Sequence, residues 1–132
     1  MAHSPVYKEN TYTVYNDDAG LAKIRKARRE VDARQNHTTA NALFNILLSI
    51  AGLFSQTLGF TSLLFSGAET SNDTYLEKLE NFYTIIEEDM ANSSLRIMRV
   101  IITDRYKGTW HEQADAYKYS ALLPRVEYVI RP

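Results

Sequence analysis

The stretch ALFNILLSIAGLFSQTLGFTSLLFS, residues 42–66, holds fifteen apolar residues, eight uncharged polar residues and two glycines. A run of this length is too long for one ordinary β-strand. Its apolar positions extend around nearly every side of a helix, so the stretch predicts a long hydrophobic helix that could break near Gly59. A helix that is apolar nearly all round must be surrounded by protein or by lipid.

Small or polar residues recur along this stretch at intervals of three and four, which places them on one side of a helix. This candidate helix-packing seam consists of Ala42, Asn45, Ser49, Gly52, Gln56 and Gly59. Larger apolar side chains occupy the other positions. The pattern predicts close packing of a neighbouring helix, either in a helical core or at a subunit interface.

A membrane span is the main alternative for residues 42–66. At about 1.5 Å per residue the helix would extend about 37 Å, enough to cross a hydrocarbon core of about 30 Å. Basic residues precede it, which is typical of the cytoplasmic side of a span. Asn45, Gln56 and the amphipathic segments downstream, which need an apolar surface to cover, favour burial in protein instead. Membrane lipid is therefore kept as an alternative partner.

Charge is distributed unevenly around the hydrophobic stretch, although 15 Lys and Arg nearly balance 16 Asp and Glu. No charged residue occurs at 35–68, and acidic residues dominate 69–89. The segment before is basic, and its cations are Lys23, Arg25, Lys26, Arg28, Arg29 and Arg34. They could contact an anion such as a nucleic-acid phosphate or a lipid headgroup. Nucleic acid is suggested by charge alone, and a solvated helix is the simpler interpretation.

Helical patterns dominate the rest of the chain. The expected additional helices cover 18–35, 74–90, 95–107 and a segment from 109 that must stop before Pro124. Thr74 and Glu77 have the spacing of a capping box, and Thr109 and Glu112 repeat it. Gly108 suits the left-handed position after a helix. Residues 6–15 and 126–130 alternate in a way that is typical of extended chain.

A β-hairpin is the alternative for the C-terminal part. Residues 100–103 have high strand propensity, and Gly108 could lie in a hairpin that returns through Tyr117 and Tyr119. The apolar positions at 95–102 fit a helical period better than strict alternation, so the helix is preferred. The predicted fold is mainly α, a small bundle around one long hydrophobic helix with extended arms at both ends. The alternative is α+β with a C-terminal hairpin.

Enzyme chemistry finds little support. The chain has no cysteine, and its histidines His3, His37 and His111 are scattered. His111 and Glu112 lack the second histidine of a zinc-protease helix, and His111 with Asp115 supplies only two ligands. We therefore predict no catalytic, cofactor-binding or metal-binding residues and no cofactor. No small-molecule substrate is evident, and the N-terminal residues lack the pattern of a cleavable signal peptide.

These observations predict an extended arm at 1–17 and a single helical domain at 18–132. We expect a non-enzymatic, self-assembling structural subunit of the coat, filament or tube type, a homo-oligomer packed through the hydrophobic helix and the terminal arms. Two alternatives stay open. One is a single-span or pore-forming membrane protein, and the other is a nucleic-acid-binding module that uses the basic helix at 21–34.

Overall fold

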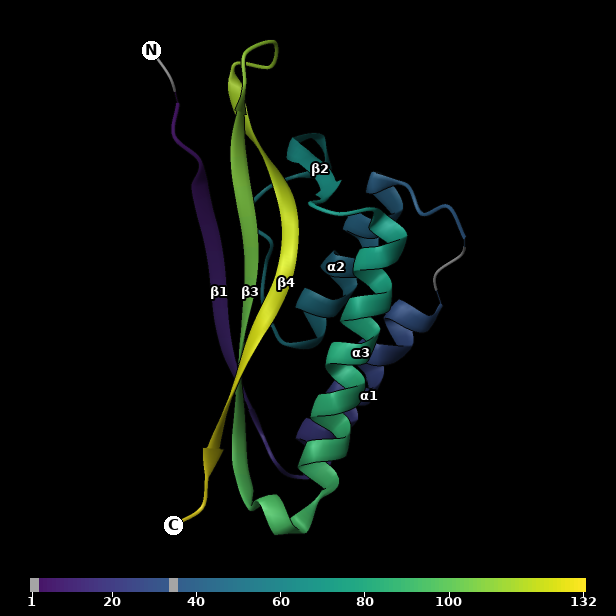
Figure 1. Ribbon diagram of the computed structural model, residues 1–132, viewed down its shortest axis with the longest axis vertical. Coiled ribbons are helices and arrows are strands. Elements are labelled where there is room, and N and C mark those ends of the chain that lie inside the picture. Colours follow the sequence, from purple (N-terminus) through teal and green to yellow (C-terminus); the bar gives the residue numbers. More distant parts are fainter. Residues whose placement is uncertain (1–2, 34–35) are drawn as a thin grey trace.

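The computed structural model describes residues 3–33 and 36–132, which form three α-helices and one four-stranded mixed sheet (Figure 1). In chain order the elements are β1 (Val6–Tyr15), α1 (Asp18–Asp32), α2 (Ala40–Leu53), the 3-10 helix η1 (Ser62–Leu64), β2 (Phe65–Ala68), α3 (Asn72–Ala91), the 3-10 helix η2 (Ser93–Leu95), β3 (Ile97–His111) and β4 (Ala116–Ile130). The strand order in the sheet is β1-β3-β4-β2.

The sheet is built on the long β3–β4 hairpin. β1 pairs antiparallel with β3 along its whole length, with Val14 opposite Val100, and the short β2 pairs parallel with β4. The β3–β4 register shifts between Thr103 and Arg105. Leu123 and Pro124 of β4 lie opposite a single β3 residue at this irregularity. A bulge tolerates proline, which has no N–H to donate to the neighbouring strand.

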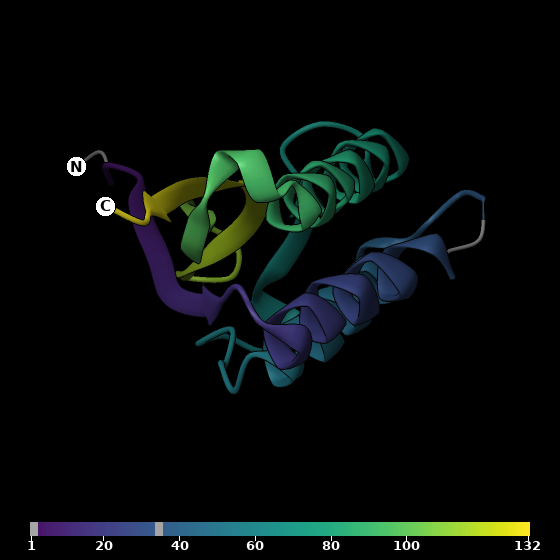
Figure 2. The same cartoon turned by 90° about the horizontal axis from the view of Figure 1, so that it is seen from below.

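The helices cover only one face of the sheet (Figure 1, Figure 2). Seen from below in Figure 2, the strands and the helices form two layers, and no part of the described chain covers the outer side of the strands. We call this outer side the open face. The core lies between the layers, where the fully buried side chains include Ile24, Leu43, Leu76, Leu79, Tyr83, Ile86, Val100 and Ile102.

The first and third helices agree with the sequence patterns. α1 begins after Asp17, whose carboxylate accepts a hydrogen bond from the Gly20 N–H at 2.7 Å. α3 has the predicted period, but its N-cap is Ser71, whose hydroxyl accepts from the Thr74 N–H at 3.1 Å. The predicted capping box at Thr74 and Glu77 is therefore wrong. The helix begins at Asn72, and its N-cap lies three residues before Thr74.

The prediction of a mainly α fold is wrong, and the alternative with a C-terminal hairpin fits the structure. Residues 95–123, expected to form two helices, belong mostly to β3 and β4. Gly108 does not end a helix. It lies inside β3, and a Cβ there would come within 2.7 Å of the Tyr119 ring and of the Val6 side chain. Glycine is needed because these two side chains fill the space above the backbone.

The long hydrophobic helix is also absent. α2 ends at Leu53, and Ser55 adopts a left-handed conformation with φ of 57°. The Gln56 N–H donates back to the Ala51 carbonyl at 2.8 Å, which closes the helix and turns the chain. Later apolar residues such as Leu58 and Phe65 reach the same core from a loop and from β2. No helix in the described part of the chain combines the length and apolarity needed to cross a membrane.

Both terminal segments are strands of the chain's own sheet. Residues 6–15 form β1, and residues 126–130 form the last part of β4. Each of them pairs with β3. The sequence predicted that both segments would offer their backbone groups to neighbouring copies. On the side that faces β3, these groups instead form hydrogen bonds within the chain.

Candidate functional site

The candidate seam residues fall into two groups. Ala42, Asn45, Ser49 and Gly52 lie on α2 and are all exposed, on the side of the helix opposite the buried Leu43, Leu47 and Ile50. Gln56 and Gly59 lie beyond the end of the helix. The structure therefore aligns four of the six residues in one outward stripe. None of these four packs into the core of its own chain.

An exposed leucine and a shallow hollow extend this stripe. Leu48 projects beside it and is 48% exposed. At the start of α2 a hollow of about 430 Å³ opens, lined by Ala33, Asn36, His37, Thr38, Thr39, Ala42, Asn45 and Ile46. We call the stripe, Leu48 and this hollow the uncharged surface. Its described residues carry no Lys, Arg, Asp or Glu.

The basic helix α1 is partly neutralised by α3. One carboxylate oxygen of Glu87 lies 2.9 Å from the Arg25 Nε, and the other lies 2.7 Å from an Arg28 guanidinium nitrogen. Lys23, Lys26 and Arg29 are exposed. The sixth candidate cation, Arg34, lies outside the described residues. The charge that suggested a nucleic-acid helix is thus reduced to three free cations within the described part of α1.

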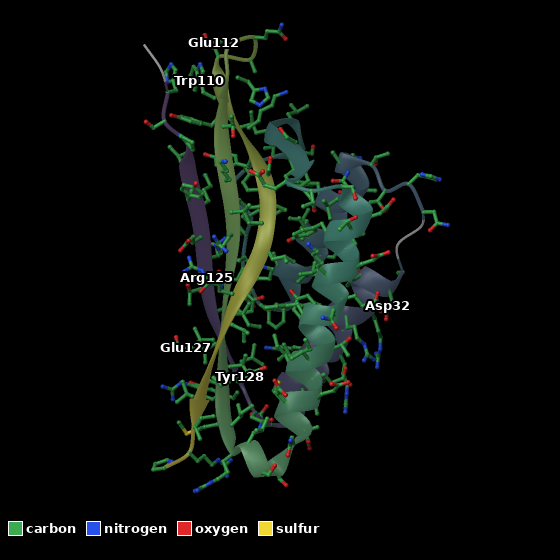
Figure 3. All side chains as sticks on the ribbon, viewed as in Figure 1. Asp32, Trp110, Glu112, Arg125, Glu127 and Tyr128 are labelled. Carbon is green, nitrogen blue, oxygen red and sulfur yellow. The ribbon has the colours of Figure 1, made fainter. Side chains whose placement is uncertain are left out.

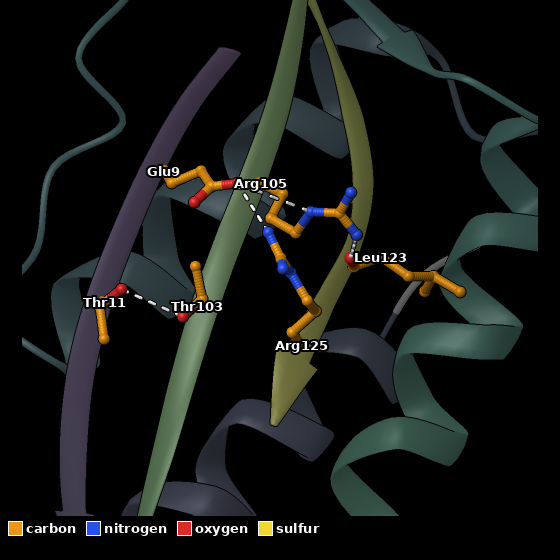
Figure 4. Close-up of polar contacts among 6 residues, drawn as sticks. All are labelled: Glu9, Thr11, Thr103, Arg105, Leu123 and Arg125. Carbon is orange, nitrogen blue, oxygen red and sulfur yellow. Dashed lines mark hydrogen bonds and ion pairs between the residues drawn. The ribbon is translucent and has the colours of Figure 1, made fainter. Parts of the chain in front are cut away.

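The open face of the sheet carries a network of polar side chains from three strands (Figure 4). Glu9 of β1 lies 2.9 Å from an Arg125 guanidinium nitrogen and 4.0 Å from the Arg105 Nε. Next to it, the hydroxyl groups of Thr11 and Thr103 share a hydrogen bond of 3.0 Å. The sequence did not predict this face, because the apolar positions at 95–102 fit a helical period better than strict alternation and residues 95–123 were expected to form helices.

A partly buried carboxyl group lies between the sheet and the helices. Asp104 shares a small cavity with Tyr75, Tyr83 and Tyr106. Burial raises the pKa of Asp104 to about 7, and the neighbouring Tyr12 hydroxyl opposes this shift in part. The cavity has a volume of about 10 Å³. Such a space holds about one water molecule, so it is too small for an organic substrate.

The histidine and acidic residues near 111 lie at the end of the hairpin. His111 closes β3, and Asp115 occupies the turn with φ of 50°. Trp110 and Glu112 mark this end in Figure 3, beyond the helix layer. Among residues 3–33 and 36–132, no three His, Cys, Asp or Glu side chains come together to hold a metal ion.

Comparison with known proteins identifies no family for this chain. No protein-family model, curated protein or solved structure matches the chain. The fold and surfaces define a two-layer α/β protein with three helices on one face of a mixed sheet. The uncharged surface and the open face are its two candidate interaction surfaces.

Proposed function

We propose that this chain is a non-enzymatic structural subunit that pairs with a second copy through the uncharged surface on α2. The observation that carries the proposal is the exposed stripe of Ala42, Asn45, Ser49 and Gly52, which lacks the charge expected on the solvent side of a surface helix.

The other two helices show what an ordinary outer side looks like in this fold. α1 exposes Lys23, Lys26 and Arg29, and α3 exposes Glu77 and Glu88. Charged residues are depleted where proteins contact one another and enriched on surfaces that stay in water. By this criterion α2 is the helix suited to a protein partner.

Small side chains allow two helices to approach closely. A Cβ added at Gly52 would meet no atom within 4 Å, so the space above this residue is open in the single chain. Leu48 supplies an apolar contact beside the stripe. A two-fold contact uses the same patch on both copies, and an uncharged patch meets its own copy without electrostatic repulsion. A second copy is therefore the partner that this surface fits best.

The test compares matched charge substitutions by size-exclusion chromatography with light scattering over a series of protein concentrations. Asn45→Glu adds a charge to the stripe, and Asn81→Glu adds the same charge on the exposed side of α3. We expect the wild-type chain and Asn81→Glu to form dimers and Asn45→Glu to stay monomeric. A monomeric wild-type chain at all concentrations, or equal behaviour of the two variants, contradicts the proposal.

Gly52→Leu distinguishes close packing of two α2 helices from non-specific hydrophobic association. Leucine adds apolar area in open space, so the single chain tolerates it. If the two α2 helices pack closely, the added side chain holds them apart and weakens the dimer. Stronger association of Gly52→Leu would overturn the close-packing account.

A further inference from the structure

We propose that the open face of the sheet binds single-stranded nucleic acid, with cations contacting the phosphates and two exposed tyrosines stacking on bases. This site is separate from the uncharged surface of α2 and from the basic helix α1.

The open face is identified by the strand register. Residues directly opposite one another in a sheet point to the same side. Tyr7 of β1, Lys107 of β3 and Ser120 of β4 form one such row, and the residues that face the helices, such as Gly108 and Tyr119, alternate with it.

Positive charge dominates this face. Its cations are Arg99, Arg105, Lys107, Lys118 and Arg125. Its carboxylates are Glu9 and Glu127 of the strands and Glu69, which follows the end of β2. Lys118, Lys107, Arg105 and Arg125 occupy four successive rows along the sheet. A line of cations with this regular spacing suits a chain of phosphates better than a single anion.

Several charges are held in place before any ligand arrives. Arg125 and Arg105 both approach Glu9, and an Arg105 guanidinium nitrogen donates to the Leu123 carbonyl at 3.5 Å (Figure 4). Lys107 lies 3.7 Å from Glu69, which follows the end of β2. These contacts offset part of the positive charge. Arg99 and Lys118 form no ion pair with the described residues and stay available for phosphates.

Two tyrosines give the face its aromatic surfaces. Tyr7 and Tyr15 are 58% and 61% exposed, the two most exposed aromatic residues among the large hydrophobic side chains at the surface. Each lies opposite a cation on β3, Tyr7 opposite Lys107 and Tyr15 opposite Arg99. They lie eight positions apart on β1, which corresponds to about 27 Å at about 3.4 Å per residue.

This arrangement favours single strands over duplexes. Single-stranded nucleic acid presents unstacked bases that pack on aromatic side chains, while its backbone follows a positively charged surface. In a duplex the base faces are covered, and Tyr7 and Tyr15 would have nothing to stack on. The free cations of α1 are not accompanied by an exposed aromatic side chain on that helix.

The experiment measures binding of a fluorescently labelled oligothymidine of about 12 nucleotides by anisotropy at several salt concentrations. A sheet variant, Arg99→Gln with Lys107→Gln and Lys118→Gln, is compared with a helix variant, Lys23→Gln with Lys26→Gln and Arg29→Gln. Both remove three positive charges from exposed or partly exposed positions. We expect the sheet variant to lose at least about tenfold in affinity and its salt slope to fall by about 2, and the helix variant to bind almost as the wild type does.

The tyrosines are tested by Tyr7→Leu and Tyr15→Leu, which keep an apolar side chain on the strand. Each should weaken oligothymidine binding by about fivefold or more and leave binding of inorganic polyphosphate unchanged. Thermal unfolding of each variant shows that the fold is retained. Four results would overturn the proposal: no binding at low salt, equal losses in the sheet and helix variants, a duplex bound as tightly as the single strand, or tyrosine variants that bind like the wild type.

Discussion

The side-chain amide of Asn16 donates a hydrogen bond to the Met90 carbonyl oxygen at 3.0 Å. The same nitrogen donates to the Ile97 carbonyl at 2.9 Å. Asn16 thus connects the β1–α1 junction to the last turn of α3 and to the start of β3, which lie 74 and 81 residues later in the chain.

Replacement of Asn16 by alanine should destabilise the fold. The carbonyls of Met90 and Ile97 would lose a partly buried donor, and an unsatisfied polar group costs about 1–3 kcal/mol. Urea denaturation measures the change in the free energy of unfolding. Asn41→Ala, at an exposed position in the first turn of α2, serves as the control and should change this free energy by less than about 0.5 kcal/mol. Equal effects of the two substitutions would contradict the role given to Asn16.

Two glycines should respond to alanine in opposite directions. A Cβ at Gly20 would lie 1.9 Å from the Tyr15 carbonyl oxygen, because the first turn of α1 packs against the end of β1. We expect Gly20→Ala to destabilise the fold by about 2 kcal/mol or more. Gly52 has open space around it inside α2, and Gly52→Ala should stabilise the single chain by about 0.5–1 kcal/mol. Thermal unfolding at low protein concentration compares them, and a well-tolerated Gly20→Ala would show that the close approach is not rigid.

Stability should fall as the pH rises from about 4 to about 7. Burial raises the pKa of Asp104 from 3.8 to about 7, so the folded chain keeps a proton in this range that the unfolded chain has released. Stability therefore decreases with pH across this window, by at most about 1.4 kcal/mol per pH unit from this group.

Asp104→Asn removes the titratable carboxyl group and keeps the shape of the side chain. In denaturation curves the variant should lack the decline between pH 4 and 7 that we expect for the wild type, and it should be the more stable of the two above pH 7. Asp73 titrates below this window, because backbone N–H groups of Thr38 and His37 lower the pKa of its carboxyl group. Parallel pH profiles for wild type and Asp104→Asn would contradict this prediction.

Local signals in the sequence predicted α1 and the period of α3. Asp17 caps the first helix within a few residues of its own position, and such contacts can be recognised in a short window. The strands could not be predicted in this way, because they form through contacts between residues that are distant in the sequence. β3 is held between β1 and β4, and β1 lies about ninety residues earlier in the chain. The apolar residues at 95–102 fit a helical period, and only pairing with β1 and β4 selects the strand.

The sequence did not predict the end of α2, for a different reason. Apolar residues continue past Leu53, since Leu58 and Phe65 enter the same core from a loop and a strand. Ser55 makes the left-handed turn there, although glycine is the usual residue in that conformation. Composition showed that residues 35–68 are uncharged. Only the structure showed that Asn45 and Ser49 of this run face outward.

Disulfide formation between single-cysteine chains tests the pairing of α2 helices most directly, because the natural chain has no cysteine. Ser49→Cys places a thiol in the middle of the uncharged surface, and Asn81→Cys places one on the exposed side of α3. Under mild oxidation at low micromolar concentration, we expect rapid, nearly complete disulfide dimers of Ser49→Cys and only slow dimers of Asn81→Cys. Equal rates for the two variants would contradict the proposal that two copies meet through α2.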